Sequence, residues 1–434
     1  MDLAVPASSV VDRATPRIPR TRYPASEVSP ARSMAAMNHT LLAQARELLP
    51  GIVELRRTLH RHPEIGNDLP VTRETVLAAL EGLPLEIHLH ETTSGIVAVL
   101  EGGKPGPAIV LRGDMDGLPM PEDTGLPYAS EVHGAMHACG HDLHTAMLVG
   151  AARLLSALTD ELSGTVVFMF QPGEEGHHGA QIMLDEGLLE VVEPAPTGAF
   201  AIHVTALYEA GTIHHRPGPQ MASADEVYVT ITGRGGHASA PYLAHDPIPV
   251  AAEIVLAVET ALTRRINVLD PAVVTFARMV AGTTHNVIPE AAELSGTIRA
   301  LSVETRTEVH EMIERVATNV AAAHGVEAHV RIRAGYPVTV NDEEFSQLVT
   351  DVATDLVGAG SVTPLPYPIM GAEDWSYVLQ RVPGAMAFLG ACPTDLVPGE
   401  APNNHSNRVC FDEDAMAVGV ALYGAVAMAH LPAN

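Results

Sequence analysis

The sequence predicts an α/β protein in which a smaller α+β domain interrupts a larger α/β domain. Apolar strands alternate with helices over residues 41–204, as in an α/β sheet. From about Asp225 the pattern changes to two runs of strand, helix and strand, and α/β texture returns from about Pro337. We therefore expect four segments: a disordered extension at 1–38, the larger domain at 39–222, the inserted domain at 223–336, and the rest of the larger domain at 337–434.

Apolar periodicity and turn residues predict the elements of the larger domain. A helix should run from Leu41 to His62, where the following proline stops it, and a second should begin near Thr72. Strands are expected on both sides of a Gly/Pro turn at 102–107. The remaining expected elements are strands at 96–100, 108–112, 165–170 and 199–204, and helices at 145–158, 180–189, 342–357, 375–380 and 414–430.

The inserted domain opens on a strand in which Val227, Val229 and Ile231 alternate with polar residues, the pattern of a half-buried strand. After it we expect a helix at 247–265, strands at 272–280 and 292–301, a helix at 303–324 and a strand at 327–334. The resulting order, β-α-β-β-α-β, is the ferredoxin-like arrangement.

Charge and composition exclude several classes of function. The chain has 434 residues, with 52 acidic against 25 basic residues and a net charge of −27. We therefore expect neither nucleic acid nor an anionic membrane as a partner, because both need a basic surface. No apolar run approaches the roughly 18 residues that span a bilayer. Three scattered cysteines predict no disulfide framework and a reducing, cytoplasmic setting. Lys104 is the only lysine, which disfavours Schiff-base chemistry.

Residues 1–38 differ from the rest, with several arginines, prolines and serines and no helical periodicity. They also lack the apolar stretch of a secretory signal. We expect a disordered extension, or residues upstream of a true start at Met34 or Met37; a transit peptide is a third reading.

A dense group of metal-binding residue types lies at 137–145, with the sequence His-Ala-Cys-Gly-His-Asp-Leu-His-Thr. A thiolate among imidazoles favours Zn or a similar ion over Mg or Ca. A histidine-rich surface turn is the alternative, because the chain has 22 histidines.

Further polar residues follow apolar strands. Asp114 and Asp116 follow the strand at 108–112, and Glu174 and Glu175 follow the strand at 165–170. His203 is part of the apolar strand at 199–204, where a lone histidine is more often a core residue than a ligand. Because ligands collect at the carboxyl ends of strands in open α/β sheets, we expect one shared crevice. There one glutamate can bind metal while its neighbour acts as general base, although a solvated acidic loop is the other reading.

Four more residues are candidates for the functional site, although an ordinary structural role could also explain them. His405 lies in a turn-rich loop and could be structural. His237, in a Gly-Gly-His segment, could stabilise an oxyanion or belong to a plain turn. Asn286 lies in the same domain, and Arg299 suits a substrate carboxylate or an ordinary salt bridge. The chain has no Gly-x-Ser-x-Gly, His-Glu-x-x-His or Walker motif, and a Cys139 nucleophile would leave the acidic pairs without roles.

An ordered set of motifs resembles the aminoacylase/carboxypeptidase family of zinc-dependent metallopeptidases, within it the amidohydrolase branch of hippurate hydrolases, auxin–amino-acid conjugate hydrolases and N-acyl-amino-acid deacylases. The resemblance covers about residues 41–430. Its motifs are LHRHPE (59–64), RGDMDGLP (112–119), MHACGHDLHTA (136–146), QPGEEG (171–176), IHV (202–204), GGH (235–237), NVIP (286–289), GAEDW (371–375) and NHS (404–406).

The resemblance implies a zinc-peptidase-like catalytic domain with two divalent ions per subunit, which could be Zn, Mn or Co. It implies the ligands Cys139, His141, Glu175, His203 and His405. Glu174 would be general base and acid, and Asp116 would orient a ligand histidine. The inserted domain would serve as lid and homodimer interface, with His237 reaching the partner's site and Asn286 and Arg299 holding substrate.

The expected activity is hydrolysis of the amide bond of N-acyl amino acids by a metal-activated water. A dipeptidase, an N-carbamoyl amino acid hydrolase and a non-catalytic metal-binding protein are the alternatives. The family often has histidine where Tyr242 stands, which leaves the lid contacts and the substrate preference open. Gly117 and Gly173 also replace common alanines, without touching the expected ligands.

Overall fold

The computed structural model describes residues 34–431. Most of the predicted extension, residues 1–33, lies outside the described residues. The prediction was wrong for residues 34–38, which belong to helix α1 (Met34–Arg61). That helix ends within one residue of the expected position, because Pro63 cannot continue it.

The larger domain is built on a mixed eight-stranded sheet with the order β1-β2-β4-β3-β5-β16-β6-β15. Strands β3, β4, β5 and β16 are parallel to one another. The pairs β1–β2, β2–β4 and β16–β6 are antiparallel, and β15 is parallel to β6. The strands are β1 Glu86–Leu89, β2 Ile96–Glu101, β3 Lys104–Asp114, β4 Ser163–Gln171, β5 Gly198–Glu209, β6 Ile213–His215, β15 Val362–Pro364 and β16 Gly384–Cys392.

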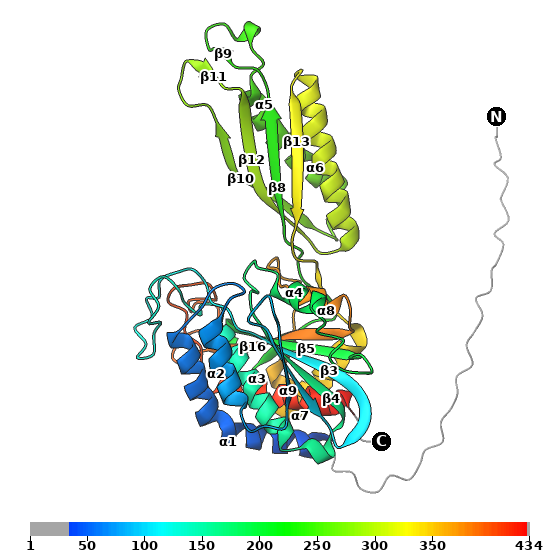
Figure 1. Cartoon of the computed structure of the whole chain (residues 1–434). Coiled ribbons are helices and arrows are strands. Elements are labelled where there is room, and N and C mark those ends of the chain that lie inside the picture. The colour runs from blue at the N-terminus through cyan, green and yellow to red at the C-terminus, as the bar shows by residue number, and fades with distance from the viewer. Residues whose placement is uncertain (1–33, 432–434) are drawn as a thin grey trace, which may run out of the picture. The chain divides into compact units, whose positions relative to one another are not determined.

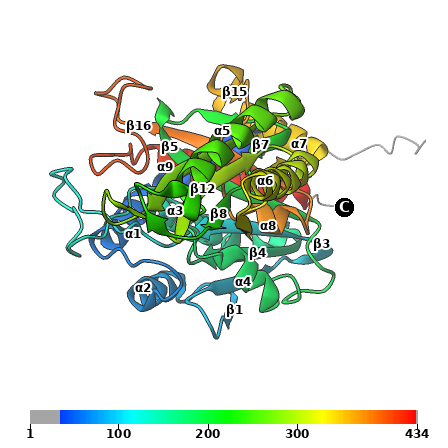
Figure 2. The ribbon, with the colours of Figure 1, turned by 90° about the horizontal axis from the view of Figure 1, so that it is seen from above.

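Helices cover both faces of this sheet (Figures 1 and 2). Successive strand residues point to opposite faces, so Ile109 and Leu111 enter one hydrophobic core while Val110 enters another. The first core is closed by α1, α3 (His141–Ser156), α7 (Glu343–Val357) and α9 (Ala415–His430), with α2 (Pro70–Leu80) beside α3. The second is closed by α4 (Gly179–Asp185) and α8 (Ser376–Leu379).

The inserted sheet has the order β10-β12-β8-β13, fully antiparallel, with α5 and α6 packed on its apolar face. This confirms the ferredoxin-like arrangement. Its elements are β8 Asp225–Thr232, α5 Pro247–Arg265, β10 Ala272–Ala281, β12 Ala291–Ala300, α6 Val303–Ala323 and β13 Glu327–Ala334. The side chains of Asp246 and Ser302 cap α5 and α6 by accepting backbone N–H groups, which explains why both helices begin where the sequence predicts.

Two short strand pairs and three 3₁₀ turns complete the described elements. The pair β9 (Gly236–His237) and β11 (Val287–Ile288) lies at the end of β8 and β12 opposite to Asp225. The others are β7 Gly218–Met221 with β14 Thr339–Asn341, and the turns Thr159–Glu161, Pro241–Leu243 and Ala359–Ser361.

The α/β fold class with an inserted α+β domain is confirmed, and the residue boundaries of the domains stay predictions. Several local expectations were wrong. The helix expected at 180–189 ends at Asp185. β3 already begins at Lys104, inside the expected turn. His203 lies in the middle of β5, not at its end. Strand β16 was missed altogether, because its Gly-Ala-Met-Ala-Phe-Leu-Gly-Ala-Cys sequence has no β-branched residue, although every one of its residues is buried.

Within residues 34–431, no helix combines the length and the apolar character needed to cross a bilayer.

Candidate metal centre

Strand order brings distant polar residues to one edge of the large sheet. Strands β3 and β4 end in register at Asp114 and Gln171, and the turn after β4 carries Glu174 and Glu175. His203 reaches the same edge from β5, the other neighbour of β3. The meeting point therefore depends on the parallel alignment of three strands that are far apart in the chain.

The loop before α3 supplies Cys139 and His141. Gly140 has φ +92°, and a Cβ there would lie 2.4 Å from Cγ2 of Val204, so only glycine allows this tight turn. His405 comes from a separate loop, and its backbone N–H donates to the carbonyl of Ala138 at 2.9 Å. The Asn404 amide also donates to the carbonyl of Cys139 at 2.9 Å. The two loops thus hold each other in place.

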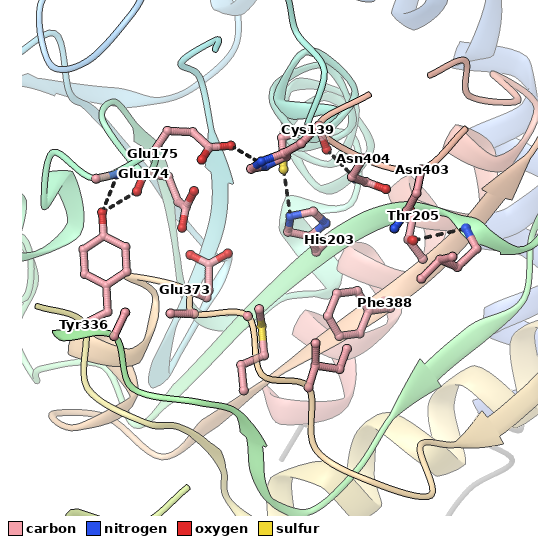
Figure 3. Close-up of a pocket in the computed structure, with 18 of the residues that line it drawn as sticks. Cys139, Glu174, Glu175, His203, Thr205, Tyr336, Glu373, Phe388, Asn403 and Asn404 are labelled. Carbon is pink, nitrogen blue, oxygen red and sulfur yellow. Dashed lines mark hydrogen bonds and ion pairs between the residues drawn. The ribbon is translucent and has the colours of Figure 1, made fainter. Parts of the chain in front are cut away.

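The five expected ligands converge. Figure 3 shows three of them, Cys139, Glu175 and His203. Sγ of Cys139 lies 3.4 Å from Nε2 of His203, and Nε2 of His405 lies 3.0 Å from Oε1 of Glu175. Three overlapping groups each place their ligand atoms within 4.8 Å of one another: Cys139, His141 and His203; Cys139, Glu175 and His405; and His141, Glu174 and Glu175.

The donor set fits metal ions. His141 donates from Nδ1 to the backbone carbonyl of Asp116 at 2.9 Å, which leaves Nε2 as the free lone pair. That Nε2 is buried and has no hydrogen-bond partner among residues 34–431, and Oδ2 of Asp114 lies 3.4 Å from it. Buried polar atoms are rarely left without a partner, so this nitrogen is oriented for a ligand. Thiolate, imidazole and carboxylate donors together suit Zn, Mn or Co.

Asp116 organises the turn that carries both glutamates. Its carboxylate accepts the backbone N–H groups of Glu174 at 3.0 Å and Glu175 at 3.1 Å. Its backbone carbonyl, not its carboxylate, makes the 2.9 Å bond that orients His141. One buried residue therefore positions a ligand histidine and the acidic pair at once.

The surroundings of the Glu174 carboxyl differ from those of the expected metal ligands. Burial, and then the neighbouring carboxylates of Glu373, Glu175 and Asp374, raise the pKa of the Glu174 carboxyl well above its usual range. Its carboxylate makes no hydrogen bond within residues 34–431, whereas Glu373 and Asp374 are both held by the buried guanidinium of Arg112, at 2.8 and 3.3 Å. A carboxyl with a raised pKa can accept and return a proton near neutral pH.

Burial also sets the charge of the candidate ligands. It lowers the pKa of His203 well below its usual range, which keeps the imidazole neutral, as metal binding requires. Hydrogen bonds to Cys139 and Glu175 raise the pKa of His405 to about 10. Burial raises the pKa of the Cys139 thiol, so a bound cation would have to stabilise the thiolate.

A cavity of about 400 Å³ opens in front of these residues. At one end it is lined by Tyr336, Gly176 and Arg299, which also line the adjoining cavity next to the inserted domain. The guanidinium of Arg299 forms no ion pair within residues 34–431 and bonds only to Thr297 and the carbonyl of Ile298. The apolar part of the lining includes Leu207, Tyr208, Met221, Ile369 and Phe388, and Thr205, Glu373, Asn403 and Asn404 add polar groups.

The expected site residues divide into two groups. The cavity is lined by Cys139, Glu174, Glu175, His203, Arg299 and His405, and His141 and Asp116 lie directly behind them. His237 and Asn286 do not line it. They lie side by side at the β9–β11 pair, where Ala238 N–H donates to the carbonyl of Asn286. This pair is at the opposite end of β8 from the junction, which is the place where Asp225 and Gly335 join the inserted domain to the larger one.

Several polar residues that line the cavity were not expected from the sequence, and Glu373 and Tyr336 are the most important of them. Glu373, in the Gly-Ala-Glu-Asp-Trp motif, lines the cavity beside Glu174. Its motif was noted, but an acidic residue before a buried tryptophan has no distinctive local signal. Tyr336 also lines the cavity, and only its contacts with a turn about 160 residues away in sequence reveal its importance.

The chain is similar to known proteins over most of its length. Residues 110–429 match the peptidase family M20/M25/M40. The chain is 35% identical over 387 residues to thermostable carboxypeptidase 1 of Saccharolobus solfataricus, covering 88% of this chain and 96% of that protein. It is 36% identical over 378 residues to an N-acetylcysteine deacetylase of Bacillus subtilis, covering 87% and 96%.

Among solved structures, a dinuclear metal binding peptidase of the M20 family from Bacillus subtilis superposes with a TM-score of 0.76 at 33% identity, covering 89% of this chain and 99% of that one. The chain therefore belongs to peptidase family M20/M25/M40. It is a metallo-amidohydrolase of that family.

Proposed function

We propose that this chain is a binuclear metal-dependent amidohydrolase that removes the acyl group from N-acyl amino acids. The observation that carries the proposal is the uncommitted carboxylate of Glu174 beside a converging set of ligand atoms. A protein that only binds metal would not need such a group. The deacetylase relative supports an N-acyl amino acid as the substrate class.

Cys139, His141, Glu175, His203 and His405 would hold two divalent ions. When bound, such ions polarise a carbonyl oxygen and lower the pKa of water toward neutrality. Zn, Mn and Co all accept this mixture of sulfur, nitrogen and oxygen donors, and availability decides among them.

The chain's own residues would do the rest of the chemistry. Glu174 takes a proton from the attacking water and returns it to the nitrogen of the leaving amine. Arg299, whose guanidinium has no carboxylate partner, binds the carboxylate of the substrate. The buried guanidinium of Arg112 holds Glu373 and Asp374 in place behind Glu174.

The two ends of the cavity also suggest how a substrate lies. With its carboxylate at the Arg299 end and its amide beside Glu174, its acyl group would enter the apolar end near Phe388. Met221 and Ile369 also line the cavity and add to its apolar surface. We therefore propose that apolar acyl groups larger than acetyl are preferred.

A substrate panel tests both statements. On apoenzyme loaded with Zn, Mn or Co in turn, we expect kcat/KM to rise from N-acetyl through N-butanoyl to N-hexanoyl amino acids, with N-benzoyl also accepted. Each buried methylene contributes about 0.8 kcal/mol, so each should raise kcat/KM by up to roughly fourfold. Activity that is flat across acyl length would contradict the apolar subsite, and no activity on any N-acyl amino acid would contradict the function.

The same panel includes dipeptides and N-carbamoyl amino acids. The carboxypeptidase relative favours peptide cleavage as the second candidate function. Dipeptides turned over faster than every N-acyl amino acid would replace the first proposal with this one. Highest activity on N-carbamoyl substrates would point to the carbamoyl hydrolase instead.

Replacing one cysteine at a time should show whether Cys139 binds metal. In Cys139→Ala we expect fewer bound ions per subunit and weaker binding of those that remain. The loss of metal affinity should exceed the roughly 10- to 100-fold decrease that follows when only a residue hydrogen-bonded to a metal ligand is removed. Cys410→Ala, outside the cavity, is the matched control and should keep the wild-type metal content by elemental analysis. Equal metal content in both variants would remove Cys139 from the ligand set.

We further propose a homodimer formed through the inserted domain. His237 and Asn286 do not line the cavity of their own chain, and about 23 Å of strand β8 separates them from the junction, at roughly 3.3 Å per residue. A second copy could bring them to its partner's cavity, where His237 would donate to the oxyanion and Asn286 would contact the substrate. A reducing, cytoplasmic setting stays a prediction that suits a free Cys139 thiol.

A further inference from the structure

Tyr336 connects the return from the inserted domain to the turn that carries Glu174. It follows β13 by two residues. Its hydroxyl donates a hydrogen bond to the backbone carbonyl of Glu174 and accepts one from the backbone N–H of Gly176 at 2.8 Å. The tyrosine thus holds both ends of a three-residue segment, and Figure 3 shows its ring below this turn with the hydroxyl pointing to it.

Hydrogen bonds to Asp225 tie the chain segment next to Tyr336 to the inserted domain. Asp225, the first residue of β8, accepts hydrogen bonds from the Gly335 N–H at 2.9 Å, from Nε of Arg306 at 2.9 Å and from Nε2 of His310 at 2.8 Å. Arg306 and His310 belong to α6, so this one carboxylate joins the entering strand, the leaving strand and a helix. Movement of the inserted domain at the junction is therefore passed directly to Tyr336.

The tyrosine has little freedom to absorb such a movement. Its side chain is buried, and its ring packs edge-on against His178 at 5.0 Å and against Tyr377 at 6.0 Å between ring centres. The hydroxyl of Tyr377 donates to the carbonyl of Gly335 at 3.2 Å. A shift of the Tyr336 backbone must then displace its hydroxyl or break its bonds to the turn.

We propose that Tyr336 is a positioning residue through which the inserted domain controls the placement of Glu174. The inference rests on the proposed role of Glu174 as general base. When the inserted domain takes up the arrangement that allows the Tyr336 hydroxyl to hold both Glu174 and Gly176, the base is held in its productive position. Displacement of a catalytic group by about 1 Å can cost 10²-fold in rate, so a two-bond clamp of this kind is sufficient for control.

The first test removes only the hydroxyl. In Tyr336→Phe we expect kcat to fall about 10- to 100-fold while KM stays within about twofold and metal content is unchanged. Tyr228→Phe is the matched control, because it removes a hydroxyl that bonds to Glu226 on β8 and touches neither the turn nor Gly335. Its kcat should stay within about threefold of wild type. Wild-type kcat in Tyr336→Phe, or an equal loss in both variants, would overturn the proposal.

The second test measures the coupling itself. Arg306→Ala weakens the junction from the side of α6, and we expect it to lower kcat in the wild-type background but not further in Tyr336→Phe. Amide hydrogen exchange of the segment 172–178 gives a readout independent of turnover. Exchange should rise in Tyr336→Phe and in Arg306→Ala, without adding in the double variant. Strictly additive changes in hydrogen exchange would refute the coupling, and they can be measured even if the wild-type chain hydrolyses no amide. A wild-type chain that hydrolyses no amide is a separate result, and it would refute the proposed function.

Discussion

Glu174→Gln should abolish turnover while the protein keeps its metal ions. The amide cannot accept a proton from the attacking water, and general-base catalysis of this kind contributes about 10²- to 10⁴-fold. The side-chain shape is retained, and the backbone N–H of Glu174 remains bound to Asp116. We therefore expect kcat to fall by at least this factor, with an unchanged metal content and an unchanged affinity for a non-hydrolysed substrate analogue.

Two comparisons make this result specific. Glu190→Gln, an equal change of charge at an exposed position outside the cavity, should keep wild-type kcat. Glu175→Gln should instead lose metal, because its Oε1 is one of the converging ligand atoms. A Glu174→Gln variant with near-normal turnover would remove Glu174 from the mechanism.

Two inactive variants, Glu174→Gln and His237→Ala, should restore activity when their subunits are mixed. Loss of an oxyanion donor costs about 10²- to 10³-fold in kcat, so each variant alone should be nearly inactive. In a mixed dimer, one cavity combines an intact Glu174 with an intact His237 from the other subunit. Random exchange makes half of the dimers mixed, with one working cavity in each, so we expect about one quarter of wild-type activity.

The control mixes Glu174→Gln with the double variant Glu174→Gln/His237→Ala, which contains no intact Glu174 and should stay inactive. Subunit exchange is followed with one variant carrying an affinity tag. If mixed dimers form and no activity returns, His237 does not act in the partner's cavity. If the chain is monomeric in solution, the homodimer proposal fails directly.

The helices and strands of the inserted domain could be predicted from local sequence patterns. Helix α5 begins and ends at the expected residues because Asp246 and the proline after it mark its start and apolar residues recur at helical spacing. Alternating apolar residues of β8 predict its buried face in the same way. The order of six such elements was enough to predict the ferredoxin-like arrangement.

Strand β16 marks the limit of this reasoning. It is built from small and flexible residues with weak strand preference, yet it lies between β5 and β6 and is buried along its whole length. Its extended conformation is stabilised by hydrogen bonds to β5 and β6. These pairings join segments that are far apart in the chain, so the residues of β16 alone do not reveal them.

The sequence by itself determined which chemistry is available: the Cys-Gly-His loop, the adjacent glutamates and the flanking strands are local patterns with direct chemical meaning. Only the tertiary structure decided which of these residues meet. It brings His203 to Cys139 and His405 to Glu175, adds Glu373 and Tyr336 to the cavity, and leaves His237 and Asn286 elsewhere. The physical reason is that such contacts depend on strand order and register, which arise from packing the whole chain at once and not from any one segment.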